Sequence, residues 1–509
     1  MKMKKRNNDL CRFTLLLSEM KLIRWAVVLL LCVSGYAEAA KPNVILLMAD
    51  DLGWGDVGYN GNKIIKTPAL DQMAREGIRF DRFYAASAVC SPTRASCLIG
   101  RNPFRTGVFY ANKGILRPEE ITVAELLKEK GYATGIFGKW HLGTFSTTIK
   151  DANRGGSRHV ELFNPPSEHG FDLYFCTESK VPTCDPMIKP AKKAKGFGWN
   201  YIKPGEKSVP YGTHYWSNKT GKNECVTTNL SGDDSKVIMD RVLPFIEGAV
   251  QEKKPFFTVV WFHAPHLPCV AAPEFAKMYK DQDMKMRNYA GCITGMDQQV
   301  GRLRAKLSEL GVAENTMIWF CSDNGPEKGT PGVTGGFRDR KRSLHEGGIR
   351  VPGLMVWPAK IKIARVEKRA CVTSDYLPTI MDVVGISRSR ISYSIDGESL
   401  LPLLDGKSFS RKHPIFFQLK NQLVSSENRY KFYQKKGKSE LYDLQADPYE
   451  KNNLAASMPE KTEQMKKQWL VWQASTKASF EGKEYGTKSF VKVHQSWWDV
   501  EKKSKRSKK

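Results

Sequence analysis

The segment Cys90-Ser-Pro-Thr-Arg-Ala-Ser96 combines residue types that could do chemistry together. Pro92 suits the first turn of a helix, where its missing N–H costs no hydrogen bond. Cys90 would then lie at the helix N-terminus, where free N–H groups and the helix dipole favour negative charge. Arg94, one turn further along, would face the same way. The spacing therefore predicts that a nucleophile, a cation and an anion-binding helix end lie together.

Several expected strands end in polar side chains. The groups that follow them are Asp50-Asp51, Lys139-Trp140-His141, the segment from His263 to His266, and Asp323-Asn324. In α/β folds the residues of a site gather beyond the carboxyl ends of parallel strands. We therefore expect these groups to meet at one edge of a sheet.

The elements that would position these groups alternate along residues 42–385. Short apolar runs predict the strands Asn43–Ala49, Ala133–Phe137, Phe256–Trp261 and Thr316–Ser322, and amphipathic runs predict the helices Thr122–Lys130, Val237–Gly248 and Tyr289–Leu310. This alternation predicts an α/β fold with a mixed, mostly parallel sheet flanked by helices on both faces.

Residues 144–235 lack clear periodicity, and a long irregular insertion of this kind usually carries function, here substrate contacts. Its aromatic side chains either stack on a sugar or pack locally, and both interpretations stay open: Trp199, Tyr201, Tyr211, Tyr215 and Trp216. After Leu404-Asp405-Gly406, short strand-like pieces and a helix near Ala455–Lys477 predict a smaller C-terminal α+β subdomain.

The 509 residues divide into four predicted parts: a signal peptide over 1–39, a large domain over 40–390, a C-terminal subdomain over 391–490 and a basic tail over 491–509. In the first part, Met20–Arg24 is basic, Trp25–Val33 is apolar but too short to span a bilayer, and Ala37-Glu38-Ala39 suits cleavage. We therefore expect a secreted or periplasmic protein without stable membrane insertion.

Charge and cysteine content narrow the function classes. The formal net charge is +27. The positive electrostatic field of such a protein attracts polyanions, namely nucleic acid, anionic lipid or sulfated glycan. Alternatively, the charge serves solubility alone. The chain has 11 cysteines and no CxxC pair, which argues against a zinc or thioredoxin-like site. Apart from Cys90 and the predicted signal, eight cysteines remain, an even number that fits an oxidising compartment.

Cys90, Pro92 and Arg94 match the Cys-x-Pro-x-Arg signature of type I sulfatases, and the chain resembles that family over nearly all of its predicted mature part. The further matches follow in family order: Asp50-Asp51, Gly100-Arg101, Gly131 to His141, His266-Leu-Pro268, Ser322 to Gly325, Lys341, Glu346 to Pro352, Asp396 to Leu401, and Glu440 to Leu454. The resemblance implies a formylglycine-dependent, arylsulfatase-like enzyme with the alkaline-phosphatase-like fold.

By this resemblance, the chain hydrolyses sulfate esters after a maturation enzyme has oxidised Cys90 to formylglycine. One hydroxyl of the hydrated aldehyde attacks sulfur, a covalent sulfo-enzyme forms, and deprotonation of the second hydroxyl expels sulfate. Arg94 and Lys139 resemble the groups that support this diol. His141 resembles the base for the second proton, and His266 and Lys341 resemble the groups that hold the sulfate and assist the leaving oxygen.

The resemblance also implies a metal site formed by Asp50, Asp51, Asp323, Asn324 and the modified Cys90. Oxygen donors suit a hard cation, Ca²⁺ or alternatively Mg²⁺, and disfavour zinc. Positive charge, secretion and the aromatic insertion favour a sulfated carbohydrate or polysaccharide, rather than nucleic acid, as the substrate.

Two other functions stay open: a phosphodiester or phosphonate ester hydrolase of the same superfamily, and a polyanion-binding protein whose Cys90 is not matured. A third function, dinucleotide binding, is rejected. Gly53-Trp-Gly-Asp-Val-Gly58 fits the GxGxxG dinucleotide pattern, but Asp50 and Asp51 precede it and would repel a pyrophosphate. His263 lacks support from neighbouring site groups, and we expect it to be structural.

Overall fold

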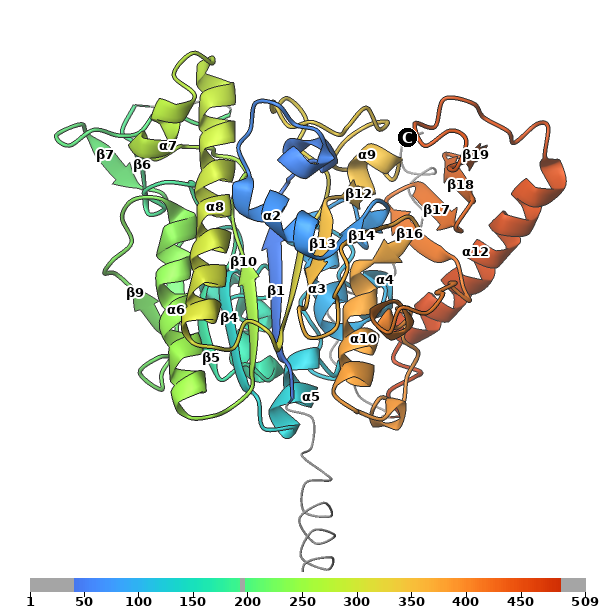
Figure 1. Cartoon of the computed structure of the whole chain (residues 1–509), viewed down its shortest axis with the longest axis horizontal. Coiled ribbons are helices and arrows are strands. Elements are labelled where there is room, and N and C mark those ends of the chain that lie inside the picture. The colour runs from blue at the N-terminus through green and yellow to red at the C-terminus, as the bar shows by residue number, and fades with distance from the viewer. Residues whose placement is uncertain (1–40, 193–196, 487–509) are drawn as a thin grey trace, which may run out of the picture. The chain divides into compact units, whose positions relative to one another are not determined.

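The computed structural model describes residues 41–192 and 197–486, so the predicted signal peptide and basic tail lie outside the described residues. Every element below belongs to the compact unit that begins at Pro42. Figure 1 shows a large sheet in this unit with helices packed against it.

The sheet has ten strands, in the order β14 (Arg365–Glu367), β2 (Ile78–Phe80), β13 (Gly353–Val356), β11 (Thr316–Ser322), β1 (Asn43–Ala49), β10 (Phe256–Trp261), β4 (Ala133–Lys139), β5 (Leu173–Thr177), β8 (Tyr215–Ser217) and β9 (Glu224–Val226). The five strands from β11 to β5 are parallel. Antiparallel neighbours, β13 and β8, flank them. The predicted fold class is therefore confirmed.

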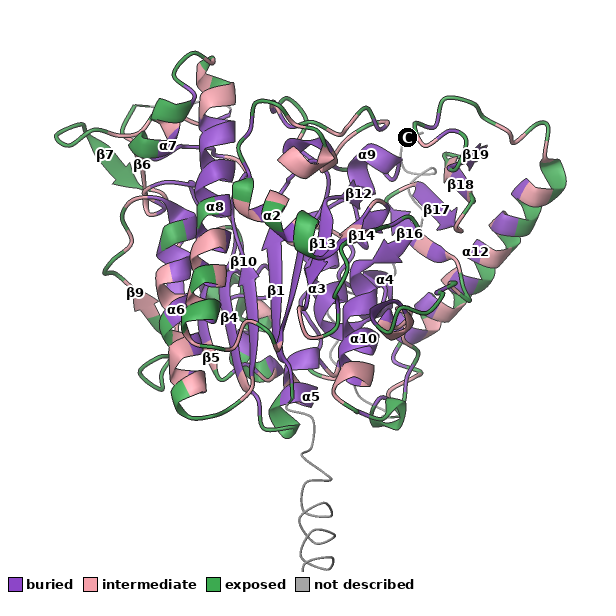
Figure 2. Ribbon diagram, viewed as in Figure 1, coloured by how far each residue is buried: buried purple, intermediate pink, exposed green. Residues whose placement is uncertain are grey.

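Strand β1 shows why the central strands are continuous apolar runs. Val44, Leu46 and Met48 face one core, with α3 (Cys90–Ile99), α5 (Val123–Glu129) and α10 (Tyr376–Val383). Ile45, Leu47 and Ala49 face a second core, with α2 (Pro68–Glu76), α6 (Asp234–Gln251) and α8 (Met284–Glu309). Both faces of the strand are thus buried, as in other parallel sheets (Figure 2).

The predicted helices and strands of the large sheet are confirmed, with differences at their ends. β4 runs two residues further than predicted, to Lys139. α6 and α8 begin earlier because Asp233 and Asp283 cap them by accepting hydrogen bonds from backbone N–H groups. α5 begins after Thr122, which forms a capping box with Glu125.

The interpretation of residues 144–235 as an irregular insertion is wrong in part. The segment contributes β5, β8 and β9 to the large sheet, and β6 (Ile188–Pro190) pairs with β7 (Ser208–Pro210). Strands of three to five residues are too short to show a period of two. Tyr215 and Trp216 are buried in the two cores, so their role is packing.

A four-stranded antiparallel sheet forms the C-terminal part, from β16 (Ile415–Leu419), β17 (Gln422–Ser426), β18 (Tyr430–Lys435) and β19 (Lys438–Asp443). Helix α12 (Pro459–Phe480) packs against it through Met465, Trp469 and Trp472. A C-terminal subdomain is therefore present, while its boundary at residue 390 stays a prediction. A further small sheet consists of β12 (Arg350–Val351), β3 (Phe83–Tyr84) and β15 (Cys371–Val372). The described residues also form the short helices α4 (Pro103–Thr106), α7 (Pro273–Met278), α9 (Glu346–Ile349) and α11 (Leu401–Leu404).

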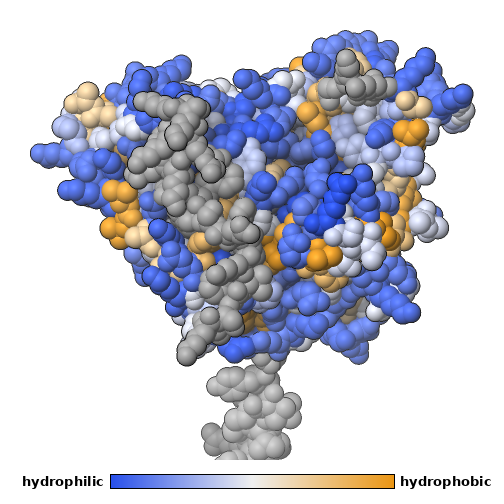
Figure 3. Space-filling model, turned by 180° about the vertical axis from the view of Figure 1, so that it is seen from behind, coloured by the Kyte–Doolittle hydropathy of each residue, from blue (hydrophilic) through white to orange (hydrophobic). Residues whose placement is uncertain are grey.

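The surface and the cysteines complete the description. None of the described helices has both the length and the apolar composition that crossing a membrane requires. The face in Figure 3 is mostly hydrophilic, with hydrophobic side chains in separate small groups. All nine described cysteines are unpaired thiols, and eight of them are buried.

Candidate active site

The parallel register brings the polar strand ends together. Ala49 pairs with Ser322, Met48 with Trp261, and Trp261 with Gly138, so β1, β11, β10 and β4 end at one level. Their following residues therefore meet at one edge of the sheet. Cys90, the first residue of α3, lies at the same place, because its Sγ is 3.6 Å from Asp50 Oδ1.

Three carboxylates at this edge are paired with three cations. Arg94 Nη2 lies 2.7 Å from Asp323 Oδ2 and 3.6 Å from Asp50 Oδ2. Lys139 Nζ lies 2.6 Å from Asp50 Oδ2. Lys341 Nζ lies 2.5 Å from Asp51 Oδ1, across 290 residues of sequence. These side chains are all withdrawn from solvent, so each charge depends on its neighbours for stabilisation.

Burial and crowding of charge shift the acidities of this group. Burial opposes ionisation of Asp50, but Lys139 and the other cations hold its pKa well below its ordinary value. Burial, followed by the charge of Asp50, raises the pKa of Asp323. Each of these two carboxylates makes ionisation of the other less favourable. A further positive charge bound beside them would stabilise the ionised form of both.

The residues at this edge fit a divalent cation. Asp51 Oδ2 and Asn324 Oδ1 are buried and accept no hydrogen bond from any described residue. Donor atoms of Asp50, Asp51, Cys90 and His266 lie within 4.8 Å of one another. Buried oxygens without a hydrogen-bond partner are rare unless an ion or water satisfies them. Carboxylate and amide oxygens form the ligand set that hard cations prefer.

Cys90 lies at the helix end that the sequence predicted, with Val89 as the preceding cap residue. Burial raises the pKa of its thiol to about 12, against the opposing effect of Lys139 and Lys341. An unmodified Cys90 is therefore a protonated thiol at neutral pH, and the thiol is a far weaker nucleophile than the thiolate.

Two histidines face this group as neutral bases. His141 has a φ of 60°, a strained backbone conformation that functional sites often contain. Its Nε2 lies 2.7 Å from the acceptor Asn112 Oδ1, which leaves Nδ1 as the basic nitrogen, without a partner among described residues. His266 donates from Nδ1 to Leu267 O, and its Nε2 lies 3.6 Å from Asp51 Oδ2. Burial lowers the pKa of both imidazoles.

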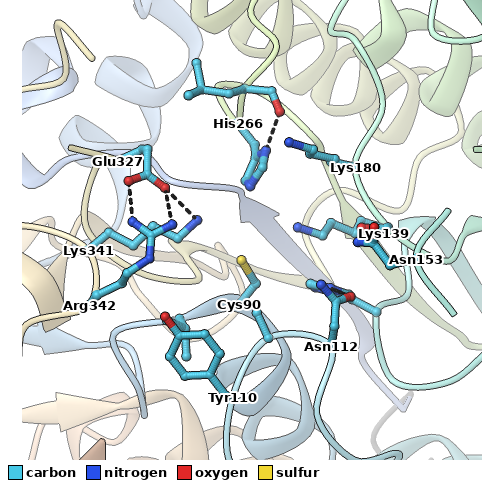
Figure 4. A pocket seen from close by; sticks show the side chains of 15 residues that line it. Cys90, Tyr110, Asn112, Lys139, Asn153, Lys180, His266, Glu327, Lys341 and Arg342 are labelled. Carbon is cyan, nitrogen blue, oxygen red and sulfur yellow. Dashed lines mark hydrogen bonds and ion pairs between the residues drawn. The ribbon is translucent and has the colours of Figure 1, made fainter. Parts of the chain in front are cut away.

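A pocket of about 300 Å³ opens above these groups (Figure 4). Five of the predicted catalytic residues line this pocket: Cys90, Lys139, His141, His266 and Lys341. Arg94 and the predicted metal-binding residues other than Cys90 are buried behind the lining. His263 does not line the pocket and instead hydrogen-bonds Asp234 and Thr177.

Sequence reasoning missed part of the lining: Tyr110, Asn112, Asn153, Ser179, Lys180, Glu327 and Arg342. Most of these residues lie in loops whose position depends on tertiary contacts. Ser179 and Lys180 also lie in a loop, but they follow the end of β5 by only two and three residues. The strand-end argument would have found Lys180 if β5 had been recognised.

Comparisons with known proteins agree with this geometry. The family model "Sulfatase" matches residues 42–386, and the model "N-sulphoglucosamine sulphohydrolase, C-terminal" matches residues 335–474. N-acetylgalactosamine-6-sulfatase of Sus scrofa is 33% identical over 429 residues, which cover 79% of this chain and 74% of that protein. Arylsulfatase G of Rattus norvegicus is 32% identical over 417 residues, with coverage of 75% and 72%.

Solved structures with the same fold include Ps i-CgsB, with a TM-score of 0.71 and 26% identity over 85% of this chain and 92% of that chain. The same protein in complex with k-i-k-neocarrahexaose has a TM-score of 0.70. The phosphonate monoester hydrolase of Agrobacterium radiobacter, 18% identical with a TM-score of 0.61, shares the fold alone.

Proposed function

The chain belongs to the sulfatase family and is a sulfuric ester hydrolase, and we propose that it cleaves sulfate esters of carbohydrates with a formylglycine made from Cys90. The observation that carries this proposal is the arrangement around the Cys90 side chain. Three lysines and two histidines line the pocket beside it, and carboxylates that follow two strands lie behind it.

The substrate class rests on the relatives and on charge. The name of one relative, N-acetylgalactosamine-6-sulfatase, and the description of one matching family model, N-sulphoglucosamine sulphohydrolase, each contain an amino sugar. A structural neighbour, Ps i-CgsB, holds k-i-k-neocarrahexaose. The net charge of +27 would attract a polyanionic chain of sulfated sugars.

Asp50, Asp51, Asp323 and Asn324 would hold the cation, with the modified Cys90 as a fifth ligand. We propose Ca²⁺, or Mg²⁺ in its place, because the donors are oxygens. When bound, the cation would supply positive charge that stabilises negative charge on the reacting oxygens. Arg94 and Lys139 hold Asp323 and Asp50 in place, and so orient two of these ligands.

The remaining pocket groups act on protons and on the sulfate. Oxidation of the Cys90 thiol to an aldehyde provides, in its hydrate, one hydroxyl that attacks sulfur and another that later loses its proton. His141 accepts that proton at Nδ1, the nitrogen that its contact with Asn112 leaves basic. Lys341 and His266 hold the sulfate and stabilise the leaving oxygen.

Maturation of Cys90 needs an oxidising enzyme as a partner. The signal peptide predicted over residues 1–39 supports a secreted or periplasmic location, in which extracellular polysaccharide is accessible.

The test compares aryl sulfates with matched aryl phosphates and phosphonates, alongside mass spectrometry of the peptide that contains Cys90. We expect the aldehyde at Cys90 and a clear preference for sulfate. Preferred turnover of phosphorus esters would instead support a phosphodiester or phosphonate hydrolase. A thiol at Cys90, with polyanion binding that survives Cys90→Ala, would support a binding protein.

A further inference from the structure

Most cations that line the pocket have a carboxylate partner. Lys139 pairs with Asp50, and Lys341 pairs with Asp51. Arg342, at the outer side, forms two contacts with Glu327, one of them 2.7 Å long. Lys180 differs, because no described carboxylate lies within ion-pair distance of its Nζ. Its ammonium group also donates no hydrogen bond to a described residue.

The backbone at Lys180 is held in place. Thr213 Oγ1 donates to Lys180 O at 3.1 Å, and Thr177 Oγ1 donates to Ser179 O at 2.6 Å. Thr177 is itself 2.8 Å from His263 Nε2, and the other ring nitrogen of His263 is 2.8 Å from Asp234 Oδ2. This buried hydrogen-bond chain gives His263 a positioning role at the start of the loop that carries Lys180.

From this position the side chain points into the pocket. In Figure 4 the Lys180 amino group points toward His266, on the side of the pocket away from Arg342. Cys90 and Lys139 are almost completely buried, whereas Lys180 is partly exposed. Lys180 therefore lies nearer to solvent than the groups that surround the reacting atom.

The electrostatic surroundings favour an anion beside Lys180. Burial, and then the charges of Lys139 and Lys341, lower its pKa. An ammonium ion that is partly desolvated next to like charges is stabilised when an anion binds to it. A sulfate that reacts at Cys90 would lie deeper than Lys180, so the alcohol part of its ester would extend toward the more exposed part of the pocket that Lys180 lines.

We propose that Lys180 is a specificity-determining residue that binds a second anionic group, a carboxylate or a further sulfate, on the alcohol part of the substrate. The enzyme would then prefer esters that carry negative charge in addition to the sulfate being removed. This inference rests on the proposed function, since it assumes that a sulfate ester occupies the pocket.

The experiment measures kcat/KM for phenyl sulfates that carry a carboxylate or the isosteric carboxamide at the ortho, meta or para position. A second arm replaces this pair by sulfonate and sulfonamide, which separates the two kinds of anion. We expect the anionic member to be preferred at one or more positions by about 10- to 100-fold, the range of a charge-assisted hydrogen bond. In Lys180→Met that preference is lost, because kcat/KM falls far more for the anionic member than for the neutral one.

Matched variants exclude a general effect of charge or folding. Lys180→Arg keeps the preference, and Lys192→Met, which removes an exposed lysine nearby in sequence, leaves it unaltered. Equal losses on charged and neutral esters would overturn the inference, because Lys180 would then hold the reacting sulfate. If the unsubstituted enzyme hydrolyses the charged and neutral esters equally well, the inference about Lys180 is overturned and the proposed function stands. Absence of turnover for every sulfate would overturn the proposed function as well.

Discussion

Lys431 Nζ lies 2.8 Å from Glu346 Oε1, and both side chains are completely buried. The contact joins β18 of the C-terminal sheet to α9, which begins five residues after the pocket residue Lys341. Lys431 also lies 2.9 Å from Glu450 Oε1. The C-terminal sheet therefore supports the segment that carries Lys341 through a cation shared by two carboxylates.

Replacing this cation tests how much the contact contributes. In Lys431→Met the carboxylates of Glu346 and Glu450 lose their shared partner, so we expect the free energy of unfolding in urea to fall by about 3–5 kcal/mol. Lys435→Met removes an exposed lysine from the same strand and should change it by less than about 0.5 kcal/mol. Equal effects of the two substitutions would contradict the role given to Lys431.

Removal of the proposed cation should abolish turnover and lower the melting temperature. Treatment with EDTA leaves the buried oxygens of Asp51 and Asn324 without a partner, and added Ca²⁺ should restore both properties. At a hundredfold excess over Kd, Ca²⁺ should stabilise the fold by about 2.7 kcal/mol, measured as a concentration-dependent melting temperature.

Asn324→Leu should eliminate this response to Ca²⁺, whereas the exposed substitution Asp281→Asn should preserve it. A melting temperature that ignores Ca²⁺ in the unsubstituted protein would argue against a cation at these oxygens.

His141 should matter for turnover more than for binding. His141→Ala removes the basic Nδ1, so we expect kcat for an aryl sulfate to fall by about 10²- to 10⁴-fold with little change in KM. Circular dichroism should show that the fold is retained. The partly exposed His159 provides the control, and His159→Ala should leave kcat unchanged. A loss confined to KM would assign His141 to substrate binding instead.

The thiols offer a test of the fold that does not depend on activity. Among the described cysteines only Cys225 is partly exposed, so the folded protein should react with a thiol reagent first at that position. Cys90 is left out of this comparison, because it lines the pocket and its proposed maturation removes the thiol. The remaining described thiols should react after unfolding, because burial both shields them and raises the pKa of most of them. Peptide mapping of the labelled protein identifies the sites, and rapid labelling of Cys321 would contradict the buried position of β11.

Local sequence was enough to predict the features that depend on local physics. The run Asn43–Ala49 predicts a buried strand because every residue after Asn43 is apolar. Thr122 and Glu125 begin a helix by capping each other's backbone, and Pro92 places Cys90 at a helix start. The strand-end argument then located Asp50, Asp323 and Lys139, because parallel strands present their carboxyl ends at one edge.

The tertiary structure decided what depends on contacts between distant segments. Arg94 meets Asp323 across 229 residues, and no local pattern encodes which carboxylate an arginine will face. Lys180 entered the pocket unforeseen because β5 is too short to show periodicity, and Tyr215 proved to be a core residue because β8 lies inside the sheet. The sequence by itself determined the reactive residues and their strands and helices. Only packing decided which charges are paired and which cation remains without a described carboxylate partner, because pairing depends on distances that the folded chain alone defines.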